Sequence, residues 1–232
     1  MNKFWQENTD TDEQLVADDF VDVLFRLQGK TIPVDHAWVL SEAISRHLPW
    51  FTEDKGSALH QIHVAESGNG WYRPDAGTDL LHLSRRTRLT LRLPQNKVDE
   101  ASQALTGKTL DLAGCEITLG ESSVKTLVSS EVLFARYVDY GPTLDEEEFL
   151  QAAHQELSSE NIRVRKMLCG RMQRLASPEG EILTRSLMIA DLDKRESIAL
   201  QQQGLGNNRK LGCGVFIPHK GIDAVGEKQK KQ

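Results

Sequence analysis

GLGNNRKLGCG, the sequence of Gly204–Gly214, is the stretch from which the organisation of the chain can be read. Two Gly-x-Gly pairs stand five residues apart, and two asparagines, an arginine and a lysine lie between them. Glycine lets backbone N–H groups approach a ligand closely, and oriented N–H groups beside cations bind phosphate oxygens. This pattern predicts a phosphate-binding loop. The residues predicted to make the contacts are Gly204, Gly206, Asn207, Asn208, Arg209, Lys210, Gly212 and Gly214.

The elements predicted before and after the loop exclude two common types of phosphate-binding loop. A P-loop is excluded because neither the Gly-Lys-Ser/Thr ending nor a following helix is present. A dinucleotide-binding fingerprint is excluded because a helical pattern precedes the loop and an apolar strand, predicted at Leu211–Ile217, follows it. A helix C-cap followed by a tight turn remains open as the alternative.

Hydrophobic periodicity places this loop near the end of a βαββαβ order of elements. Alternation predicts strands, and apolar residues three or four positions apart predict helices. The elements predicted before the final strand are a strand at Glu131–Val138, a helix from a Thr143–Glu146 capping box to Leu157, strands at Arg163–Ala176 and Glu181–Leu192, and a helix at Asp193–Gln203. This order is that of the ferredoxin-like unit, with the glycine-rich loop between its last helix and last strand.

The same order is predicted in the first half of the chain. The elements are strands at Val21–Leu27, Leu59–Ala65 and Leu80–Leu93, helices at His36–Leu48 and Val98–Leu105, and one or two short strands within Lys108–Leu119. We therefore predict an α+β fold of two tandem ferredoxin-like domains, 19–125 and 126–222. Residues 1–18 are predicted to be a flexible acidic lead-in and residues 223–232 a flexible tail.

Composition excludes several other classes of protein. The chain has 232 residues, 39% of them hydrophobic, which is enough for a folded core. No apolar run is long enough to span a membrane and no signal-peptide pattern is present, so we expect a cytoplasmic protein without a membrane partner. The three cysteines are far apart and form no Cys-x-x-Cys pair, so no structural zinc is expected.

The net charge of −6 hides a segregation of charge along the chain. Acidic residues gather in 1–24 and 139–160, whereas cations gather in two predicted strands. Such segregation allows a positive surface on an acidic protein, although solvated strand faces are the plainer interpretation. The cations concerned are Arg85, Arg86, Arg88 and Arg92 in the first run, and Arg163, Arg165, Lys166, Arg171 and Arg174 in the second.

Histidine is the natural acid–base residue near neutral pH, and two histidines lie on the first predicted helix. His36 stands in its first turn, where the positive helix end disfavours the charged imidazolium. His47 lies eleven residues further on, about 16 Å along the axis, so the two are alternatives for one site. No cluster of Asp, Glu or His has the spacing of a metal site.

Together, three stretches resemble a known family: IPVDH (32–36) with RHLPW (46–50), LSRRTRLTL (83–91) and Gly204–Gly214. The chain resembles the CRISPR-associated endoribonucleases of the RAMP superfamily that process repeat-containing precursor RNA, in particular the MYXAN-type subgroup. The Gly-x-Gly-x5-Gly-x-Gly loop is the most specific mark of that superfamily. The resemblance covers about residues 20–220 and implies tandem ferredoxin-like, RRM-like domains, as the element order also does.

The resemblance implies a metal-independent and cofactor-free cleavage of CRISPR repeat RNA. The 2′-hydroxyl upstream of the scissile phosphate attacks in line, with general acid–base help. A histidine in or just before the first helix is common in the family and corresponds here to His36, with His47 as runner-up. The two basic runs and the glycine-rich loop are then the predicted RNA-binding residues.

Two alternatives to this function remain open. The first is a non-catalytic subunit that holds guide RNA in a CRISPR effector complex. The second is a two-histidine phosphoesterase, suggested only by the HLS sequence at residues 82–84. The expected partner is repeat RNA, as precursor and as processed guide; other effector subunits are left open, and no direct DNA contact is expected.

Overall fold

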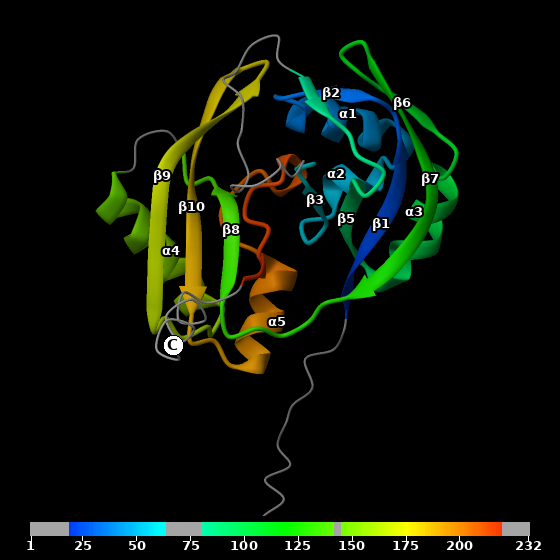
Figure 1. Cartoon of the computed structure of the whole chain (residues 1–232). Helices are drawn as coiled ribbons and strands as arrows, with labels where there is room; N and C mark the ends of the chain where they lie inside the picture. Colours follow the sequence, from blue (N-terminus) through cyan, green and yellow to red (C-terminus); the bar gives the residue numbers. More distant parts are fainter. Residues whose placement is uncertain (1–18, 64–79, 142–144, 220–232) are drawn as a thin grey trace, which may run out of the picture.

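The computed structural model describes residues 19–63, 80–141 and 145–219. The predicted lead-in and tail lie outside these residues, as does the end of the strand predicted at Leu59–Ala65. The described residues form two units that lie side by side in Figure 1, each with its own antiparallel sheet.

The first unit has a five-stranded sheet with the order β3-β5-β1-β7-β6. Its strands are β1 (Phe20–Gln28), β3 (Ala58–His60), β5 (Arg88–Pro94), β6 (Thr109–Leu112) and β7 (Cys115–Thr126). Its helices are α1 (Ala37–His47), α2 (Trp50–Glu53), the short 3-10 helix η1 (Gln95–Lys97) and α3 (Val98–Leu105). A small separate sheet pairs β2 (Thr31–Pro33) with β4 (Leu80–His82). β1 lies between β5 and β7, and β3 lies outside β5, which is the strand order of a ferredoxin-like unit.

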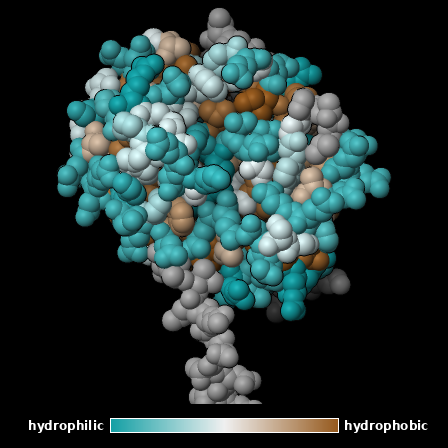
Figure 2. All heavy atoms as spheres, turned by 180° about the vertical axis from the view of Figure 1, so that it is seen from behind, coloured by the Kyte–Doolittle hydropathy of each residue, from teal (hydrophilic) through white to brown (hydrophobic). Residues whose placement is uncertain are grey.

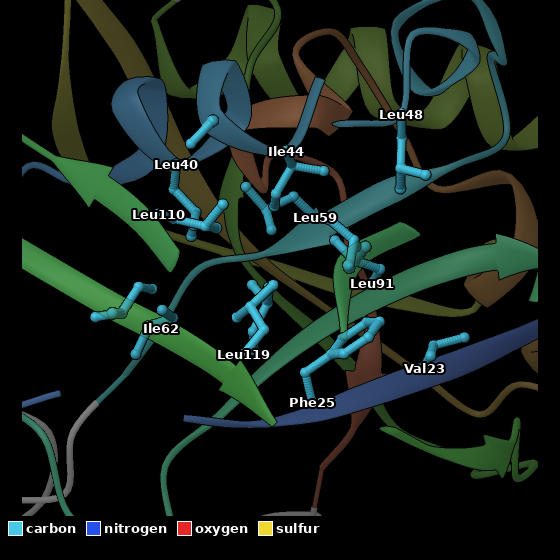
Figure 3. Close-up of a cluster of buried hydrophobic side chains, with 14 of the residues drawn as sticks. Val23, Phe25, Leu40, Ile44, Leu48, Leu59, Ile62, Leu91, Leu110 and Leu119 are labelled. Carbon is cyan, nitrogen blue, oxygen red and sulfur yellow. The ribbon is translucent and has the colours of Figure 1, made fainter. Parts of the chain in front are cut away.

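Alternation along β1 creates the core of this unit. Val21, Val23 and Phe25 are fully buried and stand opposite leucines of β5 in the antiparallel register. Figure 3 shows that Leu40 and Ile44 of α1 point into the same cluster, so the helix covers this face of the sheet. The apolar pairs across strands and the helix stripe stabilise each other by the removal of apolar surface from water.

The second unit has a four-stranded sheet with the order β11-β8-β10-β9. Its strands are β8 (Leu133–Val138), β9 (Lys166–Ser177), β10 (Gly180–Ala190) and β11 (Ile217–Pro218), and its helices are α4 (Glu146–Ser159), α5 (Lys194–Gln203) and the short η2 (Arg209–Leu211). Their chain order and sheet order again match the ferredoxin-like unit, so the predicted tandem fold is confirmed. In Figure 1, β9 and β10 form a long hairpin that extends beyond the rest of this sheet.

The predicted long strand at Leu80–Leu93 is wrong, because a turn divides it into β4 and β5. The N–H of Thr87 donates to the carbonyl of Ser84 at 3.0 Å, and the two side-chain hydroxyls lie 3.1 Å apart. Arg92, one of the cations predicted to contribute to a positive surface, is only 1% exposed. Its side of the sheet faces the second unit rather than solvent, which alternation alone cannot reveal.

Two further predicted boundaries are corrected. The capping box of α4 is formed by Asp145 and Glu148, two residues later than the predicted Thr143–Glu146. The last strand contains only Ile217–Pro218, because Gly212 and Gly214 have φ of +85° and +65°, a left-handed conformation incompatible with a strand. The chain between η2 and β11 is therefore irregular.

The surface seen from behind is mostly hydrophilic, with hydrophobic side chains gathered in one patch near its upper edge (Figure 2). None of the helices in the described ranges is long and apolar enough to cross a membrane.

Candidate functional site

The glycine-rich loop, Gly204–Gly214, is largely buried apart from Asn207 and Asn208, and several of its N–H groups donate within the protein. The N–H of Gly206 donates to the carboxylate of Glu156 at 3.0 Å, and the N–H of Asn207 donates to the carbonyl of Asp139 at 2.9 Å. The N–H of Gly214 donates to the carbonyl of Tyr137 at 2.7 Å. The N–H groups of these three residues thus fix the loop to β8 and α4, rather than forming an open phosphate cradle.

Glu156 and Asp139 are two anchors of the loop that sequence reasoning missed. Glu156 also accepts a hydrogen bond from the hydroxyl of Tyr140 at 2.5 Å, and burial together with this carboxylate raises the pKa of Tyr140. Asp139 accepts a second bond from the side-chain amide of Asn208 at 2.6 Å. The carboxylates of Glu156 and Asp139 thus accept hydrogen bonds from the loop donors that the sequence predicted would bind phosphate.

The two cations of the loop point into the boundary between the units. Arg209 donates to the carbonyl of Gly56 in the first unit at 3.0 Å and to that of Gln202 at 2.9 Å, and burial lowers its pKa to about 10. Lys210 donates to the carbonyls of Asp54 and Ser57, and burial lowers its pKa to about 8. The prediction that these two side chains contact phosphate is therefore corrected, since both are committed to main-chain carbonyls.

Arg92 provides a second link between the units. It donates to both carboxylate oxygens of Asp22, at 2.8 and 3.1 Å, and to the carbonyls of Gln201 and Phe216 at 2.8 and 2.9 Å. Burial opposes ionisation of Asp22, but the hydrogen bond from His60 and the charges nearby outweigh it, so the pKa of Asp22 lies well below its usual value. Arg92 is thus an interior ion-pair partner rather than a predicted RNA contact.

His36 is at the N-cap of α1, close to the predicted place, but it is only 2% exposed. Its Nδ1 lies 3.0 Å from the carbonyl oxygen of Pro33, and its Nε2 accepts the N–H of Ile62 at 3.0 Å. Since Nε2 is an acceptor, we assign the proton to Nδ1, which donates to the carbonyls of the β2–α1 turn. Both ring nitrogens are engaged with the main chain, so in this arrangement neither is available to a phosphodiester.

The segment Gln61–His63 lies next to both His36 and the glycine-rich loop. The side chain of Gln61 donates to the carbonyl of Leu211 at 2.8 Å, and the ring of His63 lies 6.2 Å from that of Tyr137. His63 is exposed, whereas the two residues before it, Gln61 and Ile62, are buried. We call this place, formed by His36, Gln61–His63, Tyr137 and Leu211, the junction. The runner-up His47 is the last residue of α1, at the far end of that helix from the junction.

The remaining predicted cations differ in how freely they face solvent. Arg85, Arg86, Arg163 and Arg171 are exposed. Arg88 is half-buried and donates to the carbonyls of Arg85 and Thr87. The others form ion pairs: Arg165 with Glu196 at 2.6 Å, Lys166 with Asp191 at 3.1 Å and Arg174 with Glu181 at 2.9 Å.

Arg165 also donates to the carbonyl of Asp191, so it holds the start of β9 to the β10–α5 turn. Arg171 and Arg174 belong to β9 itself, in the hairpin of Figure 1. In the part of the chain that the structure describes, no group of three or more His, Cys, Asp or Glu side chains could hold a metal ion.

Comparison with known proteins agrees with this two-unit organisation. Residues 21–221 match a family model described as "Cas6 Crispr". The "CRISPR-associated endonuclease Cas6" of Myxococcus xanthus (strain DK1622) is 34% identical over 199 residues, which cover 86% of this chain and 81% of that protein. The match therefore includes both ferredoxin-like units.

Two solved structures share the fold at low sequence identity. "CRISPR associated protein Cas6" has a TM-score of 0.60 at 10% identity and covers 87% of this chain and 100% of its own. "An RAMP protein binding different RNA substrates" has a TM-score of 0.60 at 12% identity and covers 86% of this chain and 100% of its own. At such identities, the likeness shows the shared arrangement of strands and helices.

Proposed function

Because the chain belongs to the Cas6 family of CRISPR-associated endonucleases, we propose that it binds CRISPR repeat RNA and cleaves the precursor transcript into guide RNAs. The observation that carries this proposal is the match to the Myxococcus endonuclease, which extends over both ferredoxin-like units. The resemblance drawn from the sequence is confirmed for the family, and the reaction and its residues are proposed here.

The proposed reaction is an intramolecular transesterification that needs no metal ion. The 2′-hydroxyl loses its proton, and its oxygen forms a bond to phosphorus while the bond from phosphorus to the 5′-oxygen breaks. The leaving 5′-oxygen gains a proton. The products are a 2′,3′-cyclic phosphate end and a 5′-hydroxyl end, and the protein contributes positioning, charge stabilisation and proton transfer.

We predict that the protein cuts its own repeat RNA at one position in the presence of EDTA. Since the nucleophile is the 2′-hydroxyl, a single 2′-deoxy substitution upstream of the cut should abolish cleavage without weakening binding. Product ends are identified by mass spectrometry, and a shuffled RNA of equal length serves as control. A repeat that is bound but stays intact would contradict the cleavage proposal and favour the alternative function, a non-catalytic subunit that holds guide RNA. Cleavage that occurs only when Mg²⁺ is added would contradict metal independence.

The exposed arginines of β9 are proposed to contact the phosphate backbone of the repeat. Arg171 is exposed, and the ion pair of Arg174 with Glu181 is itself exposed, so both guanidinium groups can reach an RNA. Recognition of A-form RNA rests largely on its shape and on backbone contacts.

The double variant Arg171→Ala/Arg174→Ala should bind the repeat more weakly, with a shallower dependence of affinity on salt. Each lost phosphate contact should reduce the slope of log K against log salt by about 1. Filter binding across a salt series measures this slope. Lys108→Ala, an exposed cation on the α3–β6 turn, is the matched control, and an unchanged slope in the double variant would remove β9 from the RNA path.

A further inference from the structure

We propose that His63 is the general base of the cleavage reaction and that His36 is a positioning residue that acts through it. This inference rests on the proposed RNA cleavage and names the side chain that takes the proton of the 2′-hydroxyl.

The first argument is the placement of His63 at the junction. Gln61, two residues earlier, donates to the carbonyl of Leu211 in the glycine-rich loop. Tyr137, whose ring faces that of His63, accepts the N–H of Gly214 through its carbonyl. An exposed imidazole therefore stands where β3 of the first unit meets the loop of the second.

The second argument is the role that His36 plays in the same place. Its Nε2 accepts the N–H of Ile62, the residue before His63. His36 thus fixes the backbone that carries the exposed imidazole, while its own ring stays buried and its nitrogens stay engaged. A general base must bring a nitrogen within hydrogen-bond reach of the substrate proton, and of these two side chains only His63 is at the surface.

The other histidines of the described chain lie elsewhere. His60 bonds to Asp22 at 3.3 Å, and burial lowers the pKa of His60, so its ring is engaged within the first unit. His82 lies on the small β2–β4 sheet, His154 on α4, and His219 follows β11 with its ring against Phe134. Glu156, two residues after His154, also binds the glycine-rich loop. The feature that distinguishes His63 from these three is its position directly after Ile62, whose N–H donates to His36.

The proposed step is balanced in protons and bonds. Neutral His63 takes the proton of the 2′-hydroxyl as the 2′-oxygen attacks phosphorus, and the bond to the 5′-oxygen breaks. The leaving 5′-oxygen takes a proton from solvent water, and the imidazolium returns its proton to the hydroxide so formed. No oxidant, reductant or metal ion takes part.

The test is single-turnover cleavage of the repeat RNA by the full chain. We expect His63→Ala to lower the rate about 10²- to 10⁴-fold, with an unchanged dissociation constant and melting temperature because the side chain is exposed. His154→Ala, an equally exposed histidine on α4, should cleave at the wild-type rate. Exogenous imidazole should restore part of the His63→Ala rate. A His63→Ala rate within twofold of wild type would overturn the inference, whereas a wild-type protein that does not cut would overturn the proposed function itself.

A modified substrate separates a base from an acid. If sulfur replaces the 5′-oxygen, the leaving thiolate needs no proton, so loss of an acid becomes harmless while loss of a base does not. His63→Ala should therefore remain slow on this substrate, and recovery of the wild-type rate would overturn the assignment as base.

His36→Ala is expected to differ from His63→Ala in its melting temperature and in the pH dependence of its cleavage rate. His36→Ala should lower the melting temperature, and in the folded protein it should slow cleavage without moving the pH at which the rate is half-maximal. The rate of His63→Ala should instead lose that pH dependence. A folded His36→Ala protein that loses the pH dependence while His63→Ala keeps it would return the catalytic role to His36.

Discussion

Gly214→Ala is expected to destabilise the protein by on the order of 3–5 kcal/mol and to abolish repeat cleavage at 37 °C. Gly214 has a φ of +65°, and a Cβ atom there would lie 1.9 Å from the carbonyl oxygen of Leu205, a backbone atom that cannot move aside alone. The loop would have to leave β8, with loss of the bond from the Gly214 N–H to Tyr137. Urea denaturation followed by circular dichroism measures the change.

Gly107→Ala is the matched control for this prediction. Gly107 also has a left-handed backbone, with a φ of +80°, but no atom lies within 4 Å of a Cβ built on it. Only the intrinsic strain of that conformation remains, roughly 1–2 kcal/mol. Equal losses in the two variants would show that close packing around the glycine-rich loop contributes nothing beyond backbone conformation.

Arg92→Met is expected to destabilise the protein by about 3–5 kcal/mol, because it leaves the largely buried carboxylate of Asp22 without its bidentate arginine partner. It also removes the donors to the carbonyls of Gln201 and Phe216, which connect the two units. Arg174→Ala, which breaks an exposed pair with Glu181, should cost less than about 1 kcal/mol. Adding Asp22→Asn to Arg92→Met should recover part of the loss, and a double variant no more stable than the single one would argue against an uncompensated charge as the cause.

The same ion pair predicts a pH dependence of stability. Because the folded-state pKa of Asp22 is depressed, its contribution is present above the ordinary aspartate pKa of about 3.9 and is lost as pH falls toward the folded-state value. Wild type should therefore lose more stability than Arg92→Met when both are titrated downward from pH 5. Parallel curves would indicate that Asp22 does not depend on Arg92.

The sequence was sufficient for the fold because its elements carry strong local patterns. Alternation at Val21, Val23 and Phe25 and the apolar stripe of Leu40 and Ile44 predicted β1 and α1 within a few residues of their observed bounds. The position of the glycine-rich loop after the last helix was also predicted correctly. These features depend on neighbours in the chain, which a sequence displays directly.

The candidate site was harder to predict because its partners are distant in the chain. The acceptors of Arg209 and Lys210 near Gly56 lie about 150 residues earlier. Arg92 donates to carbonyls of the second unit, across a boundary that alternation cannot distinguish from solvent. In the sequence, His63 is only one residue of the strand predicted at Leu59–Ala65. No local signal could show that it emerges beside the loop.

The two cations of the glycine-rich loop contact the first unit through main-chain carbonyls, those of Asp54, Gly56 and Ser57. Such acceptors are present whatever side chain a residue carries, so these three hydrogen bonds depend on the backbone path of the α2–β3 segment. The three bonds therefore tolerate substitutions in this segment that leave its backbone path unchanged, whereas the links made by Arg92 and Gln61 depend on the side chains themselves.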